Sequence, residues 1–166
     1  MITIQDESSR KGRTIAMSKM IFINLPVTDL DRSKGFYAAI GARNEQKFTD
    51  SNAAMMVLSD SIYVMLLKHD FYSTFTGKPI ADAHQSSQVL LALSVDSPAE
   101  VDALVEKAGS AGGVMDPGPR QDMGGMMYER SFEDPDGHHW EPMWMDPAFA
   151  EQGAHPVETA ATEAAA

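Results

Sequence analysis

The chain has 166 residues, a formal net charge of −11 and a hydrophobic share of 43%, which is enough for an ordinary globular core. The acidic balance argues against a protein that binds nucleic acid, because such proteins gather Lys and Arg to neutralise phosphates. Cysteine is absent, so disulfides, thiolate metal ligands and cysteine nucleophiles are excluded, and no apolar run reaches the roughly 18 residues of a membrane-spanning helix. We therefore expect a cytoplasmic protein with no membrane segment.

A first structured unit is expected over residues 19–68, after a flexible N-terminal extension at 1–18. Its opening segment, 20–27 (MIFINLPV), is apolar enough to predict a largely buried strand. Thr28-Asp29 offers a helix N-cap, and Gly41 is a natural residue to end the helix that follows.

The unit continues with two short apolar runs, 53–58 and 62–67, which are separated by turn-forming residues and predict a β-hairpin. The next segment, 69–87, is more polar and is expected to connect two halves of the chain, with a helical turn as one option within it.

The same pattern starts again in a second unit, expected over residues 88–147. Residues 89–95 predict a second buried strand. Ser97 and Glu100 then form a capping box with a proline at the first helical position, which is a specific signal for the start of a helix.

A second hairpin is predicted from strands 127–133 and 138–145, joined at the tetrapeptide D-P-D-G (134–137). Residues Trp140, Pro142 and Trp144 alternate along its second strand and are expected to pack against a helix. The C-terminal segment, 148–166, is rich in Ala, Glu and Thr and is expected to be disordered.

The two halves match each other at a shift of 68 residues, at which Leu25 falls on Leu93 and Val27 on Val95. A strand, a helix and paired strands therefore occur twice in the same order. This internal repeat is the strongest indication of how the chain is organised.

The segments N-L-P-V-T-D-L-D-R-S-K-G-F-Y (24–37) and R-S-F-E-D-P-D-G-H-H-W-E (130–141) resemble the vicinal oxygen chelate superfamily. This superfamily includes glyoxalase I, bleomycin-binding proteins, fosfomycin-resistance proteins and extradiol dioxygenases, and the chain is most similar to bacterial proteins related to lactoylglutathione lyase. The resemblance spans residues 20–147. It implies an α+β fold of two tandem βαβββ modules, which form a cupped mixed sheet with the helices outside, and it implies a homodimer.

Members of this superfamily hold one divalent ion with two ligands from each module. The matching positions here are Phe22, Met65, Leu90 and Glu141. Phenylalanine and leucine cannot coordinate a metal, and a thioether is a poor ligand for hard ions. We therefore expect no metal and no other cofactor.

Glu141 has two interpretations. A tight turn at Pro135-Asp136 would place Arg130 opposite Glu141, so the glutamate would be one partner of a retained ion pair. Alternatively, Glu141 is a general base or a polar anchor for a ligand.

His139 shares the face of Glu141, and the same tight turn would place Phe132 opposite it. A relocated metal site could join His139 and Glu141 to an outside donor such as His69 or His84. The alternative is a solvated His138 beside the turn and a hydrogen-bonded His139.

Three functions remain open. The first is a metal-independent protein that binds a small, partly apolar molecule in the cup. The second is a glyoxalase-like lyase that uses Glu141 and a divalent metal at relocated ligands, and the third is a structural or regulatory dimer. The three apolar ligand positions favour binding. The residues expected to contact the ligand are Phe22, Met65, Leu90, Tyr128, Arg130, Phe132, His139 and Met143.

Overall fold

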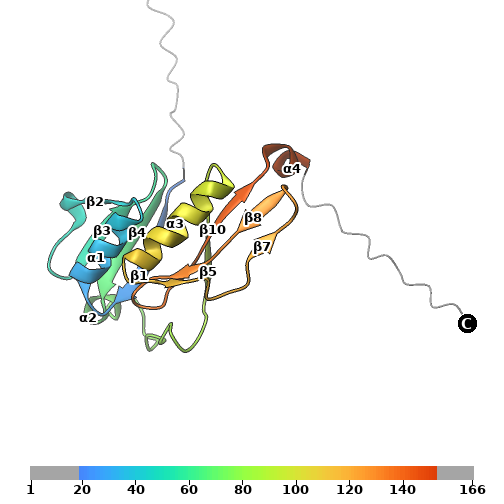
Figure 1. Cartoon of the computed structure of the whole chain (residues 1–166). Coiled ribbons are helices and arrows are strands. Elements are labelled where there is room, and N and C mark those ends of the chain that lie inside the picture. Colours follow the sequence, from blue (N-terminus) through green and yellow to red (C-terminus); the bar gives the residue numbers. More distant parts are fainter. Residues whose placement is uncertain (1–18, 153–166) are drawn as a thin grey trace, which may run out of the picture.

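A computed structural model describes residues 19–152 of the chain, which form two β-sheets with the two longest helices on one side (Figure 1). The first sheet has the strand order β1-β4-β3-β2, in which β1 and β4 run parallel. Its elements are β1 (Ile21–Val27), α1 (Leu30–Ala39), β2 (Arg43–Glu45), the short 3-10 helix η1 (Gln46–Phe48), β3 (Ala53–Val57) and β4 (Ile62–Lys68).

The second sheet has the order β6-β9-β10-β8-β7, and β5 pairs in parallel with β10. Helices α1 and α3 lie side by side on the same face of the two sheets (Figure 1). The predicted α+β fold is therefore confirmed. The remaining elements are α2 (His69–Tyr72), β5 (Leu90–Ser94), α3 (Pro98–Ser110), β6 (Val114–Met115), β7 (Gln121–Asp122), β8 (Met127–Glu129), β9 (Phe132–Glu133), β10 (His139–Met145) and α4 (Pro147–Gln152).

The internal repeat is visible in the strand register. Phe22 of β1 lies beside Tyr63 of β4, and its repeat partner Leu90 of β5 lies beside His139 of β10. Two residues further along, Met65 and Glu141 occupy equivalent places in the two sheets. The two modules therefore share one topology and one register.

Helix α1 begins and ends where its local sequence predicts. The Asp29 carboxylate accepts a hydrogen bond from the backbone N–H of Arg32 at 3.0 Å, as an N-cap does. Gly41 follows the helix with a φ of +106°, a left-handed conformation that glycine adopts without steric cost. Helix α3 is capped in the same manner by Ser97.

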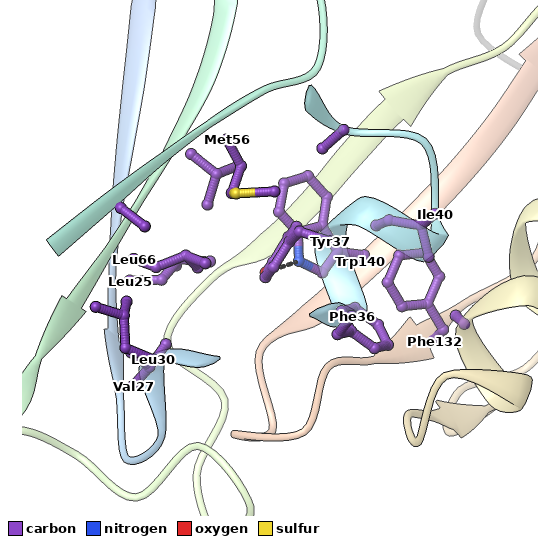
Figure 2. Packing of buried hydrophobic residues seen from close by; sticks show 14 of the residues in the cluster. Leu25, Val27, Leu30, Phe36, Tyr37, Ile40, Met56, Leu66, Phe132 and Trp140 are labelled. Carbon is purple, nitrogen blue, oxygen red and sulfur yellow. Dashed lines mark hydrogen bonds between the residues drawn. The ribbon is translucent and has the colours of Figure 1, made fainter. Parts of the chain in front are cut away.

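One hydrophobic core passes through both modules (Figure 2). Phe36 and Tyr37 of α1 pack against Phe132 and Trp140 of the second sheet, and the Trp140 indole N–H donates to the Tyr37 hydroxyl at 3.1 Å. The prediction that Trp140 packs against a helix is confirmed. Because α1 belongs to the first module and Trp140 to the second, neither module has a separate core.

The hairpin around D-P-D-G differs from the predicted register by one residue. Phe132 lies beside Trp140, not His139, and the Arg130 N–H donates to the Pro142 carbonyl. The reason is the length of the turn. The Asp134 backbone N–H donates to the His138 carbonyl, and Gly137, with a φ of +87°, is one of the residues between them. Such a turn has three residues where the prediction allowed two.

The C-terminal segment also differs from expectation, because residues 148–152 belong to helix α4 and are not disordered. The expected flexible extension at 1–18 and the rest of the expected tail, 153–166, lie outside the described residues. Within residues 19–152, no helix is long and apolar enough to cross a membrane.

Candidate functional site

A cavity of about 440 Å³ lies between β1, the segment from α2 to β5 and the start of β10. This volume is typical of sites for small molecules. One wall is formed by Asn24 to Pro26 of β1, a second by residues of the 72–89 segment, and a third by Glu133 and Gly137 to His139. The segment between the modules, expected only to connect them, therefore forms a wall of the cavity.

The 72–89 segment contacts the D-P-D-G turn directly at Gly137. A Cβ atom at this position would lie 2.8 Å from both the backbone N and the Nδ1 of His84, and 2.9 Å from the carbonyl carbon of Ala83. Only glycine leaves room for so close an approach of two backbones.

The sheet faces that point away from α1 and α3 are here called the open face. Of the residues on this face that the sequence predicts to contact a ligand, only His139 also lines the cavity. On the first sheet this face carries Phe22, which is 46% exposed and stacks on Tyr63 with 4.8 Å between ring centroids. Met65 lies two residues further along the same face of β4. On the second sheet Leu90 is 54% exposed. These three predicted ligand-contacting residues therefore form an apolar part of the open face.

His139, Glu141 and Met143 alternate along β10 on the open face. The Nε2 of His139 lies 3.5 Å from the Oε1 of Glu141, so the side chain placed to pair with Glu141 is His139 and not Arg130. Glu129, beside Met143, is close enough that burial and the charge of Glu141 raise the pKa of its carboxyl. The second sheet thus gives the open face a polar, acidic part.

Arg130 does not pair with Glu141, and this prediction is wrong. Its buried guanidinium donates to both carboxylate oxygens of Asp116, at 2.9 and 2.7 Å, and to Asp102 of helix α3 at 2.9 Å. Hydrogen bonds from Arg130 lower the pKa of Asp116 to about 2 against the cost of burial. Arg130 therefore holds the loop after β6 against α3.

Tyr128 and Phe132 are the other two predicted ligand-contacting residues that lie on the helix side. The Tyr128 hydroxyl donates to Asp102 at 3.0 Å, so Tyr128 shares the face of Arg130, as predicted, but that face meets α3. Phe132 is 1% exposed in the core. Tyr128, Arg130 and Phe132 therefore lie neither on the cavity wall nor on the open face.

Sequence reasoning missed a histidine–aspartate pair at the cavity wall. His138 was expected to be solvated, but its side chain is only 10% exposed and its Nδ1 lies 2.8 Å from the Oδ2 of buried Asp134. The same Oδ2 accepts a hydrogen bond from the Tyr37 hydroxyl at 2.8 Å. Burial and the Asp134 charge raise the pKa of Tyr37 well above its ordinary value. The spacing Asp-x-x-x-His across a short turn was the available signal.

The donor chemistry of the site does not fit the divalent ion of the resembled superfamily. Phe22, Leu90 and Met65 occupy three of the four ligand positions, and none suits a hard cation. Within residues 19–152, no group of three or more His, Cys, Asp or Glu side chains is placed to hold a metal ion.

Residues 19–141 match the family model of the Glyoxalase/Bleomycin resistance protein/Dioxygenase superfamily, and the chain belongs to this superfamily. A hypothetical protein from S. aureus, SA1046, has a similar structure, with a TM-score of 0.64, 26% identity and coverage of 77% of this chain and 94% of its own. A superfamily enzyme from Burkholderia phytofirmans gives a TM-score of 0.63 at 16% identity, over 78% of this chain and 100% of its own.

The fosfomycin resistance protein FosX of Listeria monocytogenes gives a TM-score of 0.58 at 20% identity, over 80% of this chain and 98% of its own. These likenesses at low identity concern the fold. No curated protein matches the chain.

Proposed function

We propose that this protein binds a small, partly apolar molecule in the cavity and on the adjoining open face, without the divalent ion used elsewhere in the superfamily. The observation that carries this proposal is the cavity of about 440 Å³, with the 72–89 segment as one wall, together with apolar side chains at three of the superfamily's four ligand positions. Burial of those side chains by a ligand would supply the free energy of binding.

The exposed ring of Phe22 favours a flat ligand. It stacks on the half-buried Tyr63 with the two planes at 13°, which fixes its orientation, and it lies two residues from the cavity residue Asn24. Aromatic faces bind flat apolar groups by stacking. Met65 adds a side chain that adapts to varied apolar shapes.

The same proposal includes a homodimer. Strand β1 pairs only with β4 and β5 only with β10, so each has an edge with no partner strand in the described part of the chain. Ile21, Phe22, Val89 and Leu90 at these edges are about half exposed. Because β1 and β5 are repeat partners, two copies can place β1 beside β5 twice around one twofold axis, which buries these residues.

Fluorescence of 1-anilinonaphthalene-8-sulfonate, a flat apolar dye, tests the binding site. We expect saturable binding to the native protein and a loss of about fivefold in affinity for Phe22→Ser, since an aromatic contact contributes about 1 kcal/mol. The matched control is Phe48→Ser, because Phe48 is exposed but lies on η1, away from the cavity. Equal affinity for both variants would contradict the proposal.

Elemental analysis of protein purified without chelator tests the metal-free state. We expect no stoichiometric metal in the native protein. Near-stoichiometric metal that disappears in Glu141→Gln would instead support the alternative, a glyoxalase-like lyase related to lactoylglutathione lyase. Sedimentation analysis tests the homodimer, and a monomer at micromolar concentration would remove that part of the proposal.

A further inference from the structure

We propose that His138 is the proton acceptor of the cavity, held in place by Asp134, and that the ligand carries an acidic O–H or N–H group which loses its proton on binding. This inference rests on the proposed function, because it requires a small molecule in the cavity. It adds the chemical class of that molecule and the residue that recognises it.

The first step is the direction of the hydrogen bonds around Asp134. The Trp140 indole can only donate, and it donates to the Tyr37 oxygen at 3.1 Å. The Tyr37 hydroxyl hydrogen is therefore directed to Asp134, at 2.8 Å. The other carboxylate oxygen accepts the backbone N–H groups of Asp136 and His138, both at 2.9 Å.

Asp134 thus acts as an acceptor in every one of these bonds, as an ionised carboxylate does. Its remaining partner, Nδ1 of His138 at 2.8 Å, must then be the donor. The hydrogen of the neutral imidazole is therefore on Nδ1, and the lone pair is on Nε2. Asp134 is 1% exposed, so this orientation is fixed within the core.

The second step is where Nε2 points. Among the described residues, every buried side-chain nitrogen and oxygen has a hydrogen-bond partner. The Nε2 of His138 has no partner within residues 19–152, so it is accessible, and His138 is one of the residues that line the cavity. The unpartnered basic nitrogen therefore belongs to a residue of the cavity wall.

The third step is the proton transfer itself. An O–H or N–H group of the ligand donates its proton to Nε2, which leaves an anionic ligand and an imidazolium paired with the Asp134 carboxylate. No other bond changes. The hydrogen bond from Nδ1 to Asp134 keeps the ring oriented, so Asp134 is a positioning residue.

One cation and one carboxylate, Lys78 and Glu133, lie on the cavity wall. Lys78 lines the same space and has no ion-pair partner among residues 19–152. The other titratable side chains on the wall are Tyr72 and His84 of the 69–89 segment, Glu133 of β9 and His139 of β10. His139 has its own carboxylate partner, Glu141, so it is not equivalent to His138. Lys78 is therefore placed to pair with the charge that the proton transfer creates.

The experiment uses 4-nitrophenol as the probe, because its phenol and phenolate forms absorb at different wavelengths. At the ordinary pKa of the dye, which lies near neutrality, half of the free dye is ionised, and a histidine with the ordinary pKa of about 6.5 is mostly neutral and can accept a proton. We expect nearly all of the bound dye to be phenolate in the native protein.

Two variants make the comparison specific. His138→Asn keeps an amide N–H toward Asp134 but has no atom at Nε2, so it should bind the dye without ionising it further. His69→Asn removes a histidine of α2 that does not line the cavity, so it should behave as the native protein. Equal ionisation in the native protein and in His138→Asn would overturn the proposal.

Two results separate this proposal from the proposed function. If the naphthalene dye binds and 4-nitrophenol does not, the acidic-ligand proposal is overturned while the binding site stands. If His138→Asn fails to fold, long-range ¹H–¹⁵N NMR of the native protein still decides. We expect Nδ1 of His138 to carry the proton in the neutral ring, and a proton on Nε2 would overturn the proposal.

Discussion

Asp136 accepts hydrogen bonds from both the backbone N–H and the hydroxyl of Thr28, at 3.0 and 2.6 Å, although 108 residues separate the two. Its carboxylate also accepts from Arg32 at 2.9 Å and from Ser33 at 3.0 Å. The turn of the second module therefore places a negative charge at the N-terminus of α1, where the helix dipole favours an anion.

The substitution Asp136→Asn should destabilise the protein by about 2 kcal/mol, because the neutral amide loses the charge-assisted bond from Arg32 and part of the acceptor capacity. The Asp136 side chain is 5% exposed, so water does not replace these bonds easily. Urea unfolding measures the change. Asp60→Asn, in the exposed turn between β3 and β4, is the control, and an equal effect in both variants would contradict the assignment.

The substitution Arg130→Met should cost roughly 2 to 3 kcal/mol of unfolding free energy, since it leaves Asp116 and Asp102 without their principal buried partner. Thermal or chemical unfolding measures it. Arg43→Met removes an ion pair with Glu45 on an exposed strand and should have little effect. If both variants lowered the unfolding free energy by the same amount, Arg130 would not be the link between the loop and α3.

Acidification should weaken the same contact. The pKa of Asp116 lies at about 2 in the folded protein and at 3.8 ordinarily, so the unfolded chain binds the proton first as the pH falls. Asp116 therefore stabilises the fold above pH 3.8, and this contribution is lost as the pH falls toward about 2.

The test of this pH dependence is the difference in unfolding free energy between the native protein and Asp116→Asn, measured from neutral pH to pH 2. Asn tolerates the φ of +48° at this position, so the substitution changes mainly the charge. We expect the difference to shrink across the acidic window. A difference that stays constant would show that the Asp116 charge adds nothing.

Gly137→Ala should disturb the cavity wall. Gly125 has a similar φ, +84° against +87°, but a Cβ there would meet nothing within 4 Å. Gly125→Ala should therefore lower the free energy of unfolding only by the cost of a left-handed backbone for alanine, about 1 kcal/mol. Gly137→Ala should cost more and should increase hydrogen exchange in residues 80–88, because the new methyl group displaces the backbone of His84. Equal costs would mean that this contact is unimportant.

Much of the fold follows from local signals. Asp29, Gly41 and Ser97 mark helix ends through bonds to residues within a few positions, so their roles can be inferred from the sequence. The register of the hairpin could not be inferred from the sequence, because D-P-D-G is compatible with a two-residue or a three-residue turn. That single residue decides whether Arg130 or Ser131 lies opposite Glu141.

The site was less predictable than the fold. Phe22, Met65 and Leu90 were found through the resemblance to the superfamily, whose ligand positions they match, and they lie on the open face. The partners of Arg130 and the contact of His84 with Gly137 depend on how distant segments pack. Hydrophobic periodicity in a short stretch of sequence does not indicate which distant residues come into contact.

The position of α1 in the chain has a consequence for the order of folding during synthesis. The helix has only 10 residues and includes Gly35, so it is marginal on its own. Its buried tyrosine and its N-terminus find their partners at residues 134–140, which leave the ribosome about a hundred residues later. The packing of α1 therefore cannot be completed during synthesis until the last hairpin has emerged.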